Sequence, residues 1–194
     1  MTGWIAAHFW WIDVSVAIAI LAGVAGVRRA GRASRDTTSL FVLGCAVGLA
    51  WEIPLSTLDG LGVTPIFEFL SRPPFPFPVI IASHTLWDGA LFLAGVALVR
   101  RLAPPPHFAR FSWRELGVLL AWGQLQELGI ELLATGTAGW TYVPAPWNPE
   151  LFGFRGRSIT LVPQLMWLLG AAVFYAAALR LHAPAAAAAR RGVR

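Results

Sequence analysis

The sequence predicts an all-α membrane protein, a polytopic bundle of five transmembrane helices. Of its 194 residues, 57% are hydrophobic and 13% are charged, a balance too apolar for a soluble domain of this size. In addition, five mostly apolar stretches reach about 20 residues each, the length that a helix needs to cross the hydrocarbon core. These stretches are 9–27, 40–58, 79–99, 116–135 and 159–181.

The arginines predict the direction of the bundle. All 15 basic residues are Arg; twelve lie after the first and third stretches or at the end of the fifth and beyond it, and three follow the second and fourth. Basic residues stay on the cytoplasmic side of a membrane, so we expect the N-terminus outside and the C-terminus in the cytoplasm, in a bacterial inner membrane. Because these arginines sit between apolar spans, topology explains the net charge of +5, and we expect no nucleic-acid partner.

The length predicts a single five-helix domain over residues 1–182, followed by an Ala/Arg-rich cytoplasmic tail over residues 183–194. The N-terminus lacks the basic segment of a cleavable signal, so residues 9–27 are expected to remain as a helix. Cys45 lies inside an apolar stretch, where one cysteine supports neither a disulfide nor, by itself, a metal site.

Two long outer loops, 59–78 and 136–158, are rich in proline and aromatic residues. The first contains the run from Arg72 to Pro78, and the second contains Trp140 and Tyr142. Proline stiffens such loops, and aromatic rings favour the headgroup region. Two interpretations stay open, namely an interfacial aromatic belt and a lid over a pocket that opens outward.

Polar residues of all five stretches fall at a similar depth. The helical rise places them roughly 6–14 Å below the outer boundary, while the inner half is almost purely apolar. His84 and Asp88 are four residues apart and share a helix face, as do Gln124, Glu127 and Glu131. Ionisable groups inside a bilayer are costly, so this pattern predicts a cavity in the outer half. Interhelical hydrogen bonds that merely join the helices are the alternative.

The candidate residues are therefore the intramembrane acids, the histidine, and the amides and tryptophans beside them. The candidate catalytic residues are Glu52, Asp88, Glu127, Glu131 and His84, and the candidate substrate-binding residues are Trp51, Trp87, Trp122, Gln124, Gln164 and Trp167.

Such a pocket suits acid-initiated chemistry on an isoprenoid. A carboxyl group in a low dielectric stays protonated at neutral pH, and indole faces stabilise cations. Together they favour protonation of an alkene or epoxide, followed by cyclisation or isomerisation. Glu52 is the expected acid because it is the most isolated carboxyl; Asp88, Glu127 and Glu131 would be the second acid, the base or orienting groups. His84 would relay a proton or hold Asp88. The expected partners are a lipophilic small molecule and the membrane lipids from which it enters.

The segment Leu49-Ala50-Trp51-Glu52 resembles the Trp-Glu element of the integral membrane meroterpenoid cyclases. The resemblance implies that Glu52 is a membrane-embedded acid that protonates an epoxide or alkene. That family typically has seven spans and a second acid on the last, where this chain has Gln164. The set of acids, His and Trp is also similar to sterol isomerases of the emopamil-binding type and to small membrane carotenoid cyclases, which share proton-initiated chemistry.

Other functions remain possible on the residues alone. Glu52, His84, Asp88, Glu127 and Glu131 are plausible ligands for a divalent ion, but one intramembrane His is few and no Glu-x-x-His pair occurs, so neither a metal nor a cofactor is expected. A proton-coupled transporter or lipid-binding protein would also bury acids at one depth, and so would a non-catalytic assembly subunit. Neither a phosphate loop nor a nucleophile elbow is found in the sequence.

Overall fold

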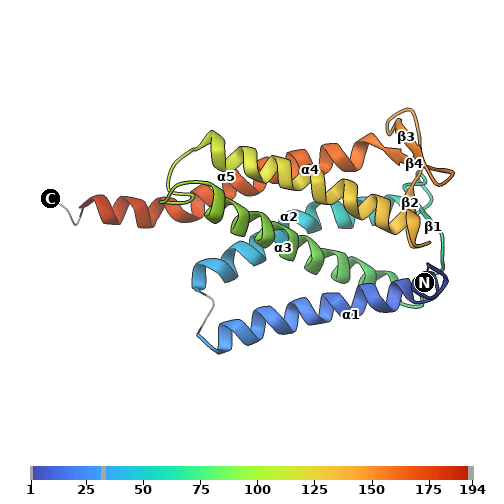
Figure 1. Ribbon diagram of the computed structural model, residues 1–194, viewed down its shortest axis with the longest axis horizontal. Coiled ribbons are helices and arrows are strands. Elements are labelled where there is room, and N and C mark those ends of the chain that lie inside the picture. Colours follow the sequence, from blue (N-terminus) through green and yellow to red (C-terminus); the bar gives the residue numbers. More distant parts are fainter. Residues whose placement is uncertain (1, 32–33, 192–194) are drawn as a thin grey trace.

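The computed structural model describes residues 2–31 and 34–191 and contains five long helices. They lie side by side along the long axis of the molecule (Figure 1). In chain order the helices are α1 (Thr2–Arg29), α2 (Arg35–Gly60), α3 (Phe77–Leu102), α4 (Trp113–Gly136) and α5 (Leu161–Arg191). Four of them, α1, α2, α3 and α5, are long and apolar enough to cross a membrane. This confirms the predicted helical membrane bundle in its coarser form.

The helices begin and end at local signals in the sequence. Ser34 caps α2 by accepting a hydrogen bond from the backbone N–H of Thr37 at 3.1 Å, and Ser112 caps α4 in the same way. Helix α5 continues to Arg191 and so runs through most of the segment expected to be a tail. Residues 192–194 of that tail, and Arg32 among the inner arginines, lie outside the described residues.

Helix α3 is central, because α1, α2 and α4 all pack against it, while α5 packs against α4 and α2. Glycines allow α2 and α3 to approach closely, since a Cβ built on Gly89 would lie 2.4 Å from Sγ of Cys45. A buried apolar cluster fills the space toward the end of the bundle opposite the N-terminus, which we call the inner end, with the rings of Phe92 and Phe174 stacked at 4.5 Å. This cluster separates the outer half of the bundle from its inner end.

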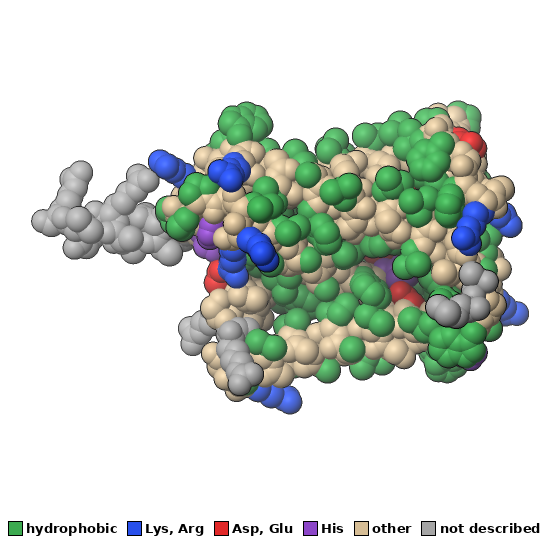
Figure 2. Space-filling view, viewed as in Figure 1, with side chains coloured by type: hydrophobic (Ala, Val, Ile, Leu, Met, Phe, Trp, Pro, Cys, Tyr) green, Lys and Arg blue, Asp and Glu red, His purple; other side chains and the backbone are tan. Residues whose placement is uncertain are grey.

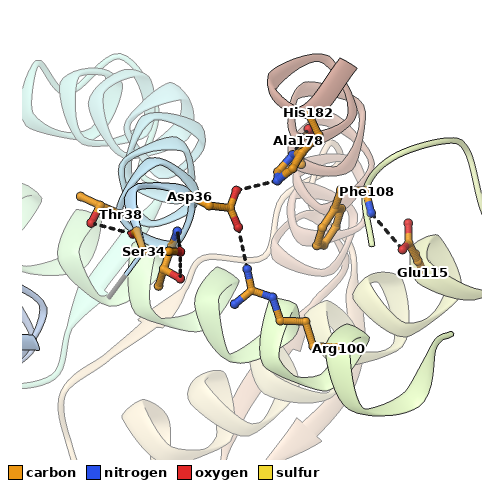
Figure 3. A network of polar contacts seen from close by, with 9 residues as sticks. Ser34, Asp36, Thr38, Arg100, Phe108, Glu115, Ala178 and His182 are labelled. Carbon is orange, nitrogen blue, oxygen red and sulfur yellow. Dashed lines mark hydrogen bonds and ion pairs between the residues drawn. The ribbon is translucent and has the colours of Figure 1, made fainter. Parts of the chain in front are cut away.

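The inner ends of three helices are joined by Asp36 (Figure 3). Its carboxylate lies 2.7 Å from Nη2 of Arg100 on α3 and 2.5 Å from Nε2 of His182 on α5. Nearby, the buried carboxylate of Glu115 accepts hydrogen bonds from the Phe108 backbone N–H and the Tyr175 hydroxyl, both at 3.0 Å. These acidic and basic side chains lie just beyond the ends of the predicted spans 40–58, 79–99, 116–135 and 159–181, so they do not bear on the predicted apolar inner half.

The two outer loops fold into short strands that the sequence did not predict. The strands are β1 (Phe67–Phe69), β2 (Trp140–Tyr142), β3 (Glu150–Phe154) and β4 (Arg157–Thr160). Strand β1 pairs antiparallel with β2, and β3 pairs antiparallel with β4. All four lie at the end of the bundle that carries the N-terminus (Figure 1). The loops thereby form one cap, which is further joined by an ion pair of 2.7 Å between Arg157 and Glu68.

Candidate functional site

A cavity of about 260 Å³ lies between the outer halves of the helices and β2 of the cap. Most of its wall is aliphatic or aromatic, and five ionisable side chains from α1 to α4 reach it. These are Asp13, Glu52, His84, Asp88 and Glu127. Figure 2 shows a hollow between α1 and the rest of the bundle, with a histidine and an acidic side chain visible inside it. Acidic groups in an apolar cavity are the arrangement that proton chemistry requires.

His84 lies between two carboxylates from different helices. Its Nδ1 is 3.6 Å from Oε2 of Glu52 on α2, and its Nε2 is 3.8 Å from Oδ2 of Asp13 on α1. The Ser83 hydroxyl donates a hydrogen bond of 2.8 Å to the same oxygen of Asp13, and the Trp87 indole N–H donates to the Asp13 backbone carbonyl at 3.3 Å. The three helices thus meet at one imidazole ring.

Asp88 and Glu127 also line the cavity and are almost fully buried. Among the described residues, Oδ2 of Asp88 and Oε1 of Glu127 have no hydrogen-bond partner. Buried polar atoms are nearly always satisfied, so two such oxygens in one cavity point to a functional use. Gly48 makes room for Asp88, because a Cβ there would lie 2.2 Å from Oδ2.

Aromatic rings form much of the remaining wall. The ring centroids of Trp51 and Trp167 are 5.3 Å apart. Trp87 is the third predicted tryptophan that lines the cavity. Indole faces attract cations through the ring quadrupole, most strongly where water is excluded. These rings can therefore help to stabilise positive charge on a bound molecule.

The cap contributes two residues that the sequence analysis did not assign to the site, Trp140 and Tyr142. Burial, helped by the nearby carboxylates of Glu127 and Glu52, raises the pKa of Tyr142 well above its ordinary value. Its phenol stays protonated at neutral pH and can donate a hydrogen bond. Asp13 was also missed as a candidate, although its position inside the first apolar stretch is a visible signal.

Four of the predicted site residues do not line the cavity. Glu131 accepts hydrogen bonds from the Thr160 backbone N–H at 3.0 Å and from Gln164 at 3.2 Å. The Gln124 amide donates to the Gln164 carbonyl at 2.9 Å, and the Trp122 indole donates to a carbonyl of α3. These contacts join helices, which is the alternative that the sequence analysis kept for polar groups in spans. The other seven predicted residues are brought together.

Within residues 2–31 and 34–191, no cluster of three or more His, Cys, Asp or Glu side chains is arranged to hold a metal ion. The comparisons with known proteins add no further constraint: no protein-family profile, curated protein or solved structure matches the chain.

Proposed function

We propose that this protein is an intramembrane acid-initiated cyclase or isomerase that acts on a lipophilic, isoprenoid-type substrate. The observation that supports this most is the convergence of Glu52, His84, Asp88 and Glu127 on one aromatic-walled cavity. An acid, a base and cation-stabilising rings are the groups that such a reaction needs. The likeness of Trp51-Glu52 to the membrane meroterpenoid cyclases is in keeping with this proposal.

In the proposed reaction the carboxyl group of Glu52 gives its proton to one carbon of a substrate double bond. The π electrons form the new C–H bond, and the neighbouring carbon becomes cationic. In an isomerisation, an adjacent C–H bond then loses its proton to Asp88 or Glu127, and its electrons form the new double bond. In a cyclisation, a second double bond attacks the cation before that loss. An epoxide reacts similarly, with protonation at oxygen.

The contacts of the cavity's carboxyl groups differ in a way that fits these two roles. Glu52 contacts His84, which can hold or deliver a proton. Asp88 and Glu127 each have one buried oxygen without a hydrogen-bond partner among the described residues, and in the proposed reaction the carboxylate of one of them accepts the proton from substrate. The faces of Trp51 and Trp167 would stabilise the cation between the two steps.

The size of the cavity supports a substrate that is held by one end. Its volume of about 260 Å³ lies just below the roughly 300–1,000 Å³ of typical small-molecule sites. The reacting end of an isoprenoid would fill it, and the chain would extend through the hollow beside α1 (Figure 2). Such a substrate would come from the bilayer, and the apolar cluster toward the inner end is unfavourable for the passage of a polar solute between the described helices.

We further propose that α4 is a fifth span and that the N-terminus lies outside, in a bacterial inner membrane. The 24 residues of α4 extend about 36 Å at the helical rise, enough to cross the hydrocarbon core. Its acids Glu127 and Glu131 are buried in the bundle, whereas Leu125 and Leu133 are exposed. Labelling of single cysteines in the cap from the outside of intact cells tests this topology.

An isomer assay tests the reaction. The purified protein in lipid nanodiscs is given polyprenyl alkenes and epoxides in D₂O, and isomeric products carrying one new deuterium are expected. Glu52→Gln should lower the rate by about 10²–10⁴-fold, the usual contribution of a general acid.

Glu115→Gln is the control, because Glu115 is also a buried carboxyl group but lies at the inner end and does not line the cavity. It should retain the wild-type rate. The proposal fails if no substrate in the panel is converted, or if Glu52→Gln and the wild type convert it equally.

A further inference from the structure

A second, smaller chamber of about 40 Å³ adjoins the main cavity on the side of the cap. Its polar lining consists of Glu52, Ser56, His84 and Tyr142, and Phe67 and Phe69 of β1 line it on the cap side. It shares Glu52, His84, Trp140 and Tyr142 with the main cavity but is not lined by Asp88 or Glu127. The chamber therefore contacts the proposed acid and its histidine without contacting the proposed bases.

The chamber has the size and polarity of a water site. A buried water needs at least about 10–15 Å³ and two to four polar partners. The four polar side chains of the lining offer a carboxyl group, a hydroxyl group, a ring nitrogen and a phenol. Because burial and the nearby carboxylates raise the pKa of Tyr142, its phenol remains a donor there. An apolar molecule of useful size would not fit in this volume.

We propose that this chamber holds a water molecule that carries protons between the outer surface and the Glu52–His84 pair. The inference rests on the proposed function, in which every turnover leaves Glu52 without its proton and leaves a base with one additional proton. The chamber water would pass a proton from the outer solvent to the Glu52 carboxylate, while the base returns its proton to solvent after product leaves. Protons are then balanced over one cycle.

A proton route through the chamber would remain usable while substrate occupies the main cavity. A lipophilic substrate in the main cavity excludes water from that face of Glu52. The chamber lies beneath β1 and β2, so it stays accessible to protons from the cap side. Asp13 acts as a positioning residue here, because it faces Nε2 of His84 and leaves Nδ1 directed toward Glu52.

Infrared spectroscopy tests the water site without any substrate. The carbonyl band of the protonated Glu52 carboxyl is assigned by its loss in Glu52→Gln, and its shift after transfer to D₂O gives the rate of proton exchange. Ser56→Leu and Ile80→Phe each fill the chamber from a different helix. Each should slow exchange about tenfold or more, because the water that carries the proton is displaced.

Two control variants distinguish the filling of the chamber from the loss of the Ser56 hydroxyl and from added bulk elsewhere in the bundle. Ser56→Ala keeps the space and should exchange within about threefold of wild type, since water can still occupy the chamber. Thr135→Leu adds bulk at a buried position of α4 that lines neither cavity and should leave exchange unchanged. Thermal unfolding establishes that each variant is folded.

The outcomes distinguish this inference from the proposed reaction. Slow exchange in the filled variants, with no isoprenoid turned over by the wild type, would uphold the water site and reject the reaction. Wild-type exchange in folded Ser56→Leu and Ile80→Phe would overturn the water site even if the isomer assay succeeds. The absence of a Glu52 carboxyl band at every pH tested would overturn it as well.

Discussion

Nδ1 of His84 lies 3.6 Å from Oε2 of Glu52, and this contact joins α3 to α2 at the wall of the main cavity. The opposite ring nitrogen faces Asp13 on α1, which packs mainly against α3. One imidazole therefore orients the proposed acid and also contributes to the position of the helix beside the hollow. A histidine with a carboxylate on each side suits proton transfer, because both ring nitrogens then have a partner to which an N–H can donate.

Replacement of His84 by Asn should lower kcat by about 10- to 100-fold, because the acid loses its proton-transfer partner while the cavity keeps its shape. KM should change little, since the apolar wall that binds the substrate is intact. Steady-state kinetics in nanodiscs measure both. His182→Asn, at the inner end of α5, is the control and should retain kcat. A raised KM with unchanged kcat would instead make His84 a binding residue.

Glu131 should behave as a structural residue. It is fully buried and accepts hydrogen bonds from Thr160 and Gln164. Glu131→Ala leaves those donors unsatisfied and should lower the free energy of unfolding by about 2–4 kcal/mol. Glu131→Gln keeps an acceptor for the Thr160 N–H and should retain activity within about threefold. Denaturation in detergent measures the stability of each variant, and kcat measures its activity. If Glu131→Gln were stable but inactive, Glu131 would be a catalytic residue, as its spacing in the sequence predicts.

The sequence was sufficient to predict the helices and much of the site, because membrane spans are long and their polar faces are periodic. His84 and Asp88 share a face by spacing alone, and the helical rise places Glu52 and Glu127 at a similar depth. All four line the cavity.

The rest depends on contacts between distant segments. Each residue turns a helix by about 100°, so a small rotation decides whether Gln124 faces the cavity or a neighbouring helix. In the structure its amide binds a carbonyl of α5 instead. Strands of three residues carry almost no periodic signal, and β1 and β2 form by pairing Phe67 with Tyr142 across the two loops. That long-range pairing brings Tyr142 to the site, and no local pattern could have predicted it.

Gly48→Ala should disturb the proposed base. Its new Cβ would lie 2.2 Å from Oδ2 of Asp88, so either the carboxylate or α2 must move. We expect a loss of about 1–3 kcal/mol in unfolding free energy, as for overpacked cores. We also expect about tenfold slower turnover, because the proton acceptor is misplaced.

The matched control is Gly117→Ala on α4, where nothing lies within 4 Å of the new Cβ. This variant should be unchanged or more stable by up to about 1 kcal/mol, since alanine favours a helix over glycine. Thermal unfolding and initial rates measure both variants. Equal rates for the two would show that the position of Asp88 does not matter for turnover.

A disulfide across the cap should leave activity intact. Glu68 and Thr141 are directly opposite in the antiparallel pair β1–β2, where Cα atoms are about 4.5–5.5 Å apart, a separation compatible with a disulfide. The double variant Glu68→Cys with Thr141→Cys should crosslink on oxidation and convert substrate at the rate of its reduced form, because the substrate is expected to come from the bilayer. A loss of activity on oxidation that is reversed by reduction would show that the cap must open.

The hollow beside α1 should instead control access. Ile12 on α1 and Leu133 on α4 line the cavity from opposite sides, and Leu133 is 62% exposed. Leu133→Trp narrows this opening and should raise KM about tenfold for long isoprenoids without changing kcat, because the reacting groups are untouched. Leu125→Trp is the matched control, since Leu125 is 70% exposed on the same helix but does not line the cavity. Kinetics with a short and a long substrate separate the effects, because a narrowed opening should raise the KM of the long substrate more than that of the short one. Equal KM values for Leu133→Trp and Leu125→Trp would mean that the substrate reaches Glu52 by another route.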